Sequence, residues 1–177
     1  DMRSKAKAVN FGIAYGQGAF GLSQKLNIPR KEAKDIIDSY FEQFHKLKSY
    51  QSEVIELARE RGFVETIMGR RRYLRDITSA NHMVRSQAER NAINAPIQGS
   101  AADMIKIAMI NIQREMKKHQ FKSKMILQVH DELVFDVFKP ELEEVKSVVE
   151  NEMKTAIKMK VPIEVESGTG LNWLEAH

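Results

Sequence analysis

Two apolar, β-rich runs separated by only three residues constrain this chain more than any other feature. Residues 125–129 and 133–138 flank His130, Asp131 and Glu132, so the two runs are expected to pair as a hairpin. Burying acids within such a pair is costly, so the two carboxylates are expected at its exposed turn. The turn contains no glycine, although tight hairpin turns favour residues that accept positive φ.

The adjacent carboxylates of Asp131 and Glu132 allow two interpretations. They repel each other, and Mg²⁺ would offset that repulsion because it prefers hard oxygen ligands. In the simpler interpretation they form a polar turn that binds nothing. The residues alone leave both interpretations open.

The hydrophobic pattern of the whole chain predicts an α+β fold, with a helical N-terminal lobe followed by an α+β lobe. Helices are expected over 2–15, from Pro29, over 47–60, over 80–94, from 100 to about 118, and from Pro140. Pro96 is expected to break the helical pattern, and Ser100 with Asp103 resembles a capping box that starts a new helix. Residues 63–67 and 71–74 predict a hairpin with a basic turn, and the alternation over 161–166 predicts a half-buried strand.

Composition excludes several classes of protein. The chain has 177 residues, 42% hydrophobic and 29% charged, as in a globular protein of one domain or two small lobes. It has no cysteine, which excludes disulfides and thiolate metal sites. No apolar run approaches the ~18 residues of a membrane span, and no signal segment follows the N-terminus. The first residue is Asp rather than Met, so the chain is expected to be a piece of something longer.

Charge is distributed unevenly along the chain. Residues 69–91 contain six arginines against two acids, whereas residues 136–177 contain five lysines against nine acids. A basic middle and an acidic tail favour one face that meets a polyanion, although a solvated basic helix surface explains the arginines equally well.

Arg3, Lys7, Phe11 and Tyr15 follow one another at intervals of four residues. On a helix they would form a stripe about 18 Å long and about 120° wide. Two cations followed by two aromatic rings suit a triphosphate with its base stacked beyond. An amphipathic helix whose aromatic side chains belong to the core is the competing interpretation.

Two further patterns carry less information. Gly16-Gln-Gly-Ala-Phe-Gly21 matches a dinucleotide-binding fingerprint, but a predicted helix precedes it, so a helix cap followed by a turn explains these glycines better.

Polar side chains interrupt the predicted helix before and after Pro96, and arginines and amides there could reach minor-groove acceptors of DNA. They are Arg85, Gln87, Arg90, Asn91, Asn94 and Gln98.

Together these segments resemble family A DNA polymerases, the DNA polymerase I family. The resemblance rests on Arg3-Ser-Lys-Ala-Lys7-Ala-Val-Asn-Phe11-Gly-Ile-Ala-Tyr15-Gly, Gly69-Arg-Arg-Arg-Tyr73, Asn94-Ala-Pro-Ile-Gln98-Gly-Ser-Ala-Ala-Asp103, Gln128-Val-His-Asp131-Glu132 and Gly168-Thr-Gly-Leu-Asn-Trp173-Leu. These motifs occur in the family's order over essentially the whole chain. The resemblance implies fingers over residues 1–80 and the C-terminal part of an antiparallel-sheet palm, flanked by helices, over residues 81–177.

The resemblance also implies a role for each motif residue. Arg3 and Lys7 would contact the triphosphate of the incoming deoxynucleotide, Phe11 would stack near its sugar and base, and Tyr15 would guard the template-base position. Arg85, Arg90, Asn94 and Gln98 would contact primer-template DNA, and His130 the primer end. Asp131 would be the metal-coordinating catalytic carboxylate, with Glu132 in support. Because position 11 is Phe rather than Tyr, the parent enzyme is expected to discriminate against dideoxynucleotides.

The implied reaction is two-metal phosphoryl transfer with Mg²⁺, in which the primer 3′-hydroxyl attacks the α-phosphate and pyrophosphate leaves. In this family a second metal-bridging Asp comes from a D-Y-S-Q-I-E motif, which this sequence lacks. We therefore expect the isolated chain not to polymerise, and its incomplete palm sheet to favour self-association. The parent would be a bacterial cytoplasmic, nucleoid-associated enzyme without a membrane segment.

Two other functions remain open on the sequence. A non-catalytic nucleic-acid-binding module would use the basic residues 69–91 and the first helix, and would bind DNA in a salt-sensitive way without metal. A metal-dependent nuclease centred on Asp131 and Glu132 would need further carboxylates, for which the sequence offers no clear candidates.

Overall fold

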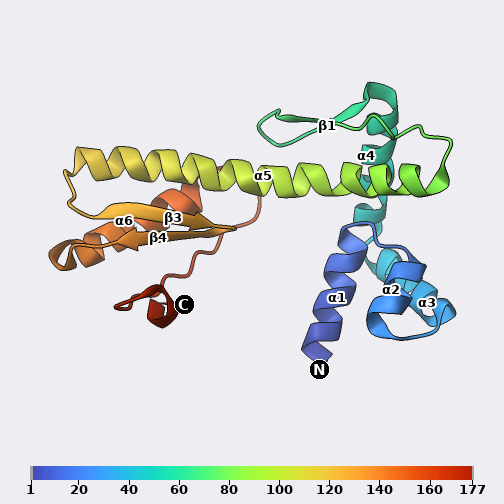
Figure 1. Ribbon diagram of the computed structural model, residues 1–177, viewed down its shortest axis with the longest axis horizontal. Coiled ribbons are helices and arrows are strands. Elements are labelled where there is room, and N and C mark those ends of the chain that lie inside the picture. Colours follow the sequence, from blue (N-terminus) through green and yellow to red (C-terminus); the bar gives the residue numbers. More distant parts are fainter. Residues whose placement is uncertain (1, 177) are drawn as a thin grey trace. The chain divides into compact units, whose positions relative to one another are not determined.

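The computed structural model describes residues 2–176 and has the expected α+β fold (Figure 1). The chain divides into two compact units, Asp1–Ser100 and Ala101–His177. The predicted division at residue 80 concerns functional lobes rather than compactness, and it stays a prediction. No helix within the described residues is long and apolar enough to cross a membrane.

Four helices begin the first unit: α1 (Met2–Ala14), α2 (Ala19–Leu26), α3 (Arg30–Gln43) and α4 (His45–Arg61). Ile13, Leu22 and Ala33 are fully buried where α1, α2 and α3 meet. Three of these helices agree with the prediction within a few residues, but α2 was not predicted. It is only eight residues long and contains Gly21, so packing of its buried Leu22, rather than intrinsic propensity, stabilises it.

The predicted basic hairpin is present in the first unit. Strands β1 (Phe63–Glu65) and β2 (Arg71–Tyr73) pair antiparallel, with Val64 opposite Arg72. The turn contains Gly69 at φ 76°, a conformation that glycine adopts without strain. Val64 packs into a second core with residues of α4 and of the helix that follows, which fixes the hairpin to both.

A single 37-residue helix, α5 (His82–Lys118), replaces the two helices predicted around Pro96. The predicted break at Pro96 and the capping-box start at Ser100 are therefore wrong. Ala92 and Ile93 are buried in the turn before the proline, and this packing outweighs the lost backbone hydrogen bond. Ser100 lies inside the helix, where its Oγ donates to the Pro96 carbonyl across 2.5 Å and accepts from the Ile67 amide of the hairpin turn across 2.9 Å.

The second unit contains the acidic hairpin. Strands β3 (Lys124–Val129) and β4 (Glu132–Asp136) pair antiparallel, with a bulge between Met125 and Leu127, and are followed by the 3₁₀ turn η1 (Lys139–Glu141) and helix α6 (Leu142–Thr155). One face of the hairpin packs against α5 and α6 around the buried residues Ala108, Ile112 and Met116 (Figure 1).

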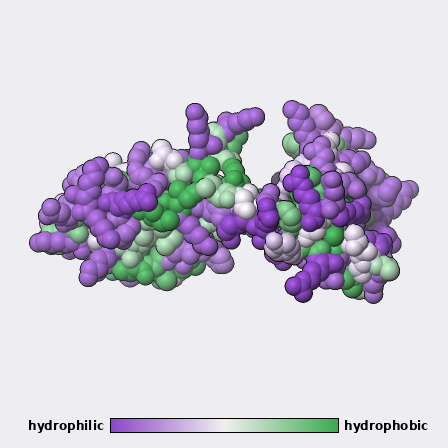
Figure 2. Space-filling view, turned by 90° about the horizontal axis from the view of Figure 1, so that it is seen from above, coloured by the Kyte–Doolittle hydropathy of each residue, from purple (hydrophilic) through white to green (hydrophobic). Residues whose placement is uncertain are grey.

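The strand predicted over 161–166 is wrong. This segment keeps the alternation, since Ile163 and Val165 are partly buried between exposed neighbours, but it pairs with no strand among the described residues. A strand needs a partner as well as an amphipathic pattern. A short terminal helix, α7 (Trp173–Ala176), ends the described chain. The surface of each unit is mostly hydrophilic and is interrupted by apolar patches (Figure 2).

Candidate functional site

The cationic and aromatic stripe lies on the open side of α1. Lys7 Nζ lies 5.9 Å from the centroid of the Phe11 ring, and that ring lies 5.9 Å from Tyr15 at an interplanar angle of 37°. Phe11 is 50% exposed and Tyr15 is partly buried, whereas Ile13 is 1% exposed. Phe11 therefore does not belong to the core, and its ring is available to a ligand.

The C-terminal end of α1 is held by side chains from outside that helix. Gln51 of α4 donates from Nε2 to the carbonyl oxygens of Ile13 and Ala14 in the last turn of the helix. The Ile13 carbonyl also accepts from the Gly16 amide across 3.0 Å. Gly16 follows at φ 74°, and a Cβ there would lie 2.7 Å from Ile93 Cδ1 and 3.6 Å from Arg90 Cγ. The cationic and aromatic stripe on α1 thus ends directly beside Arg90 of α5, one of the residues predicted to contact DNA.

The three glycines of the fingerprint each have a structural explanation. Gly16 caps α1 in the left-handed region, and Gly18 precedes α2 with extended backbone. Gly21 lies against the Gln17 side chain, which also contacts Gly12, so only residues without a Cβ leave room for that amide. A helix on each side excludes a dinucleotide-binding loop, which requires a strand before it.

The predicted DNA-contacting residues lie on the first half of α5, but they differ in how far their polar groups already bond within the protein. Arg85 donates to the Ser79 carbonyl across 2.7 Å and lies 4.0 Å from Glu89, so it is held within the protein. Exposed Arg90 donates to Gln87 across 2.9 Å and forms no ion pair among the described residues. Asn94 Oδ1 is buried without a hydrogen-bond partner among the described residues, so this amide leaves one acceptor unsatisfied. Gln98 is exposed.

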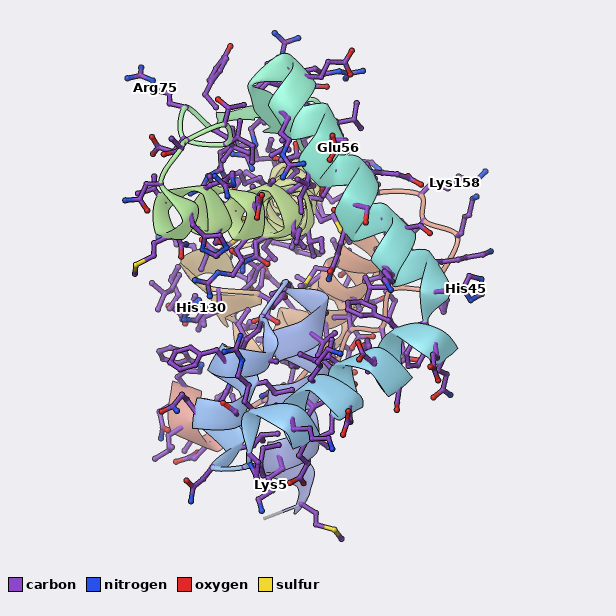
Figure 3. All side chains as sticks on the ribbon, turned by 90° about the vertical axis from the view of Figure 1, so that its right-hand side faces the viewer. Lys5, His45, Glu56, Arg75, His130 and Lys158 are labelled. Atoms are coloured by element: carbon purple, nitrogen blue, oxygen red, sulfur yellow. The ribbon has the colours of Figure 1, made fainter. Side chains whose placement is uncertain are left out.

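In the second unit, His130 and Asp131 form a two-residue turn between the paired residues Val129 and Glu132 (Figures 1 and 3). His130 has φ 54°, and Gln128 Nε2 donates to its carbonyl across 2.6 Å. Asp131 is exposed, as predicted, while Glu132 is partly buried as the first residue of β4. The hairpin therefore presents one carboxylate outward and holds its neighbour in a strand.

The donor set at this turn fits part of a site for a hard divalent cation. Carboxylate oxygens are the ligands that Mg²⁺ prefers, and the exposed Asp131 can approach one. Among residues 2–176, no cluster of three or more histidine or acidic side chains is arranged to hold a metal ion. The turn can therefore contribute ligands but does not complete a site within the described chain.

Reasoning from the sequence missed two residues that shape these sites and gave a third, Ser100, a different role. Gln51 and Gln17 position the end of α1, and Ser100 fastens the β1–β2 turn to α5. Their contacts join residues far apart in the sequence or depend on a neighbouring glycine. For Gln17, the signal in the sequence is the pair of small residues, Gly12 and Gly21, that lie against its side chain on two successive helices.

A family model described as DNA polymerase family A matches residues 1–175. The chain is 51% identical over 174 residues to DNA polymerase I of Lactococcus lactis subsp. cremoris and 50% identical over 175 residues to that of Caldicellulosiruptor bescii. These alignments cover 98% and 99% of this chain but only 20% and 21% of the relatives. The chain thus spans about a fifth of the length of the curated relatives it matches.

The fold is also similar to that of a solved polymerase domain. The POL domain of Pol1 from M. smegmatis, determined in a complex with DNA primer-template and dNTP, superposes with a TM-score of 0.96 at 45% sequence identity. The match covers 98% of this chain and 31% of that one.

Proposed function

Because the chain belongs to DNA polymerase family A, we propose that it supplies the nucleotide-binding and part of the catalytic machinery of a DNA-directed DNA polymerase. The parent enzyme would add deoxynucleotides to a primer 3′-hydroxyl under the direction of a template. The 20% coverage of the relatives makes this a proposal about a larger protein to which the chain contributes.

The stripe on α1 is the observation that carries the proposal. Lys7 and Phe11 lie side by side on the exposed face, with Tyr15 beyond them. A cation that attracts phosphate oxygens, next to a ring that offers its face, matches the two chemical halves of a nucleoside triphosphate. Arg3 begins the same face one helical turn before Lys7.

The remaining residues would act on DNA and on the reacting groups. Residues 1–80 would form fingers and residues 81–177 part of the palm. Arg85, Arg90, Asn94 and Gln98 would contact primer-template, and the His130 side chain would contact the primer end.

Asp131 would coordinate Mg²⁺, and Glu132 would support it from the adjacent strand position. Magnesium, when bound, lowers the barrier by activating the attacking hydroxyl and neutralising charge on the phosphates. The primer 3′-oxygen would attack the α-phosphate in line, and pyrophosphate would leave. A second carboxylate from elsewhere in the parent would complete the donor set, so the isolated 177-residue chain is expected not to extend a primer.

A chimeric enzyme tests the proposal. Residues 1–174 of this chain would replace the matching segment of Lactococcus lactis DNA polymerase I, and primer extension would be measured with Mg²⁺. We expect extension to be retained, and Asp131→Asn to lower its rate by at least about a hundredfold, because a metal ligand contributes several kcal/mol of charge stabilisation. Asp136→Asn, at the other end of the same hairpin, is the matched control and should have little effect.

The opposite result favours the nucleic-acid-binding function that the sequence also leaves open. A soluble, folded chimera that binds DNA in a salt-sensitive way but never extends a primer would indicate a non-catalytic nucleic-acid-binding module. Equal activity of the Asp131→Asn and Asp136→Asn chimeras would remove the catalytic role of Asp131.

Two finer expectations belong to the same proposal. The parent would act on the bacterial nucleoid in the cytoplasm. The isolated chain would self-associate through its uncovered strands, where Ile126 is 59% and Leu127 45% exposed. A monomer in sedimentation at high concentration would contradict the second expectation.

A further inference from the structure

Gln51 belongs to α4 but forms its hydrogen bonds with the backbone of α1. Its Nε2 lies 2.8 Å from the carbonyl oxygen of Ile13 and 3.2 Å from that of Ala14, the last residue of α1. The residue is partly buried, so these bonds are sheltered from competing water. One amide group thus spans the last two carbonyls of the helix that presents the cationic and aromatic stripe.

Packing of the buried face of α1 leaves its exact orientation open. Ile13 is 1% exposed and clusters with Leu22 and Ala33. Apolar burial has no preferred direction, so it resists separation of the helices more than a small rotation or tilt of α1. A hydrogen bond weakens steeply as it departs from linearity. Gln51 therefore opposes the movements that the apolar packing allows.

The backbone transmits this hold to the aromatic end of the stripe. The Tyr15 amide donates to the Phe11 carbonyl across 3.0 Å, and the Gly16 amide donates to the Ile13 carbonyl across 3.0 Å. These bonds tie residues 11–16 into one compact turn. A shift of the carbonyls that Gln51 holds would therefore also shift the two rings.

The Phe11 ring has little support outside α1. It is 50% exposed, and its ring contacts are Lys7 and Tyr15 of the same stripe. The position of the ring thus follows that of the helix end. Lys7 lies one turn nearer the N-terminus, so a small tilt at the C-terminal end of α1 would displace the rings more than the cation.

From these contacts we propose that Gln51 is a positioning residue for nucleotide selection. By holding the Ile13 and Ala14 carbonyls, it fixes the Phe11 and Tyr15 rings against the base of the incoming nucleotide. It touches neither the nucleotide nor a metal and acts through the backbone of α1. Because it requires a nucleotide at the stripe, this inference rests on the proposed function. A misplacement of about 1 Å can slow a reaction about a hundredfold, so a remote amide can matter to the chemistry.

Gln51→Met in the chimeric polymerase tests the proposal, since it keeps the length of the side chain and removes the donor. It should lower kcat for the matched nucleotide at least about tenfold and leave KM within about twofold, because Lys7 still attracts the phosphates while the rings no longer orient the base. The ratio of kcat/KM for matched over mismatched nucleotides should fall about fivefold. Single-nucleotide extension with the active enzyme titrated separates these changes from a loss of folded protein.

Two further variants show whether the donor itself is responsible. Gln51→Lys restores N–H donors at the C-terminal end of α1, where a cation is favourable, and should return kcat to within about threefold of the unmodified chimera. Gln43→Met, at the exposed end of α3, is the matched control and should change none of the three quantities. Equal kinetics of the two methionine variants would overturn the proposal, and so would a lysine variant as impaired as Gln51→Met.

Hydrogen exchange of the full 177-residue chain, resolved by NMR, gives a readout without catalysis. Gln51→Met should lower the protection of the Tyr15 and Gly16 amides about fivefold, because the turn that contains them loses its hold on α4. The Gly62 amide, which ends α4 by donating to the Ala58 carbonyl across 2.8 Å, should exchange as before. Unchanged protection of Tyr15 and Gly16 would refute the positioning of α1 by Gln51.

Failure of this inference is distinguishable from failure of the proposed function. An inactive unmodified chimera, with faster exchange in Gln51→Met, would refute the polymerase role and leave Gln51 as the residue that positions α1. An active chimera whose selectivity and exchange are both insensitive to Gln51→Met would refute the inference about Gln51 alone.

Discussion

Gln51 of α4 donates from Nε2 to the carbonyl oxygen of Ile13 at the end of α1, across 2.8 Å and 38 positions of sequence. A second contact of 3.2 Å reaches the Ala14 carbonyl, so one amide group satisfies two terminal acceptors. The position of the Phe11 and Tyr15 rings therefore depends on a residue outside every motif that identifies the family.

Gln51→Ala should lower the free energy of unfolding of the first unit by about 1 kcal/mol, because the Ala14 carbonyl loses its side-chain donor while the Ile13 carbonyl keeps only the Gly16 amide. Urea denaturation followed by circular dichroism measures the change. Gln24→Ala, at an exposed position of α2, is the matched control and should change stability by less than about 0.5 kcal/mol. Equal effects would show that the Gln51 contact contributes nothing.

Gly16 and Gly18 should respond differently to the same change. Gly16→Ala places a Cβ at positive φ and 2.7 Å from Ile93 Cδ1, so it should destabilise by at least about 1 kcal/mol. Gly18→Ala meets no atom within 4 Å and has φ −81°, so thermal unfolding should be nearly unchanged. Comparable losses at both positions would contradict the assignment of Gly16 as a helix cap.

Phe11→Tyr in the chimeric polymerase should increase dideoxynucleotide incorporation relative to deoxynucleotide by at least about tenfold, roughly the contribution of one good hydrogen bond. The exposed Phe11 ring leaves room for the added hydroxyl beside a sugar. Single-nucleotide incorporation assays measure the ratio. The same substitution at Phe20, exposed on α2, should leave the ratio unchanged. An unmodified chimera that uses both nucleotides equally would refute the role of Phe11.

Glu141 should make the second unit sensitive to acid. Hydrogen bonds from the Lys122 amide, and from the hydroxyl and amide of Ser123, lower the pKa of this carboxyl below its ordinary 4.5. A lowered folded-state pKa contributes stability above the unfolded value, and that stability is lost as the pH falls through the folded pKa. Glu141→Gln should therefore lower the urea midpoint near neutral pH, and the difference should shrink below pH 4.5.

The control for this prediction is Glu143→Gln, an exposed carboxylate in the first turn of α6. Its urea midpoint should follow that of the unmodified chain at both pH values. A Glu141→Gln midpoint that stays below the unmodified value by the same amount at every pH would show that protonation of Glu141 is not involved.

The elements that the sequence predicted correctly are those whose pattern lies in residues close together in the chain. The Asp131 hairpin follows from two apolar runs and a short polar interval, and α1 and α4 follow from helical spacing with glycine beyond each end. The exposure of the α1 stripe also agrees with its mixed chemistry, since a ring flanked by a lysine is poorly suited to a core.

The errors arose where distant residues decide the outcome. Pro96 breaks isolated helices, but burial of Ala92 and Ile93 keeps α5 continuous through it. Residues 161–166 have the alternation of a strand without a partner, and α2 is a helix because Leu22 is buried rather than because its residues favour one. Gln51 could not be assigned, since its acceptors are backbone atoms that carry no sequence signal.

The backbone at His130 illustrates how chemistry and stability compete in a tight turn. A left-handed φ of 54° is effortless for glycine and costs an imidazole-bearing residue roughly 1 kcal/mol. The flanking pair of Val129 with Glu132 compensates for this strain, and an imidazole is thereby kept next to the Asp131 carboxylate. A glycine at position 130 would remove the backbone strain, but it would also remove the imidazole, one of the two polar side chains of the turn. The residue that best fits this backbone conformation therefore has no side chain that could bind a substrate or a metal.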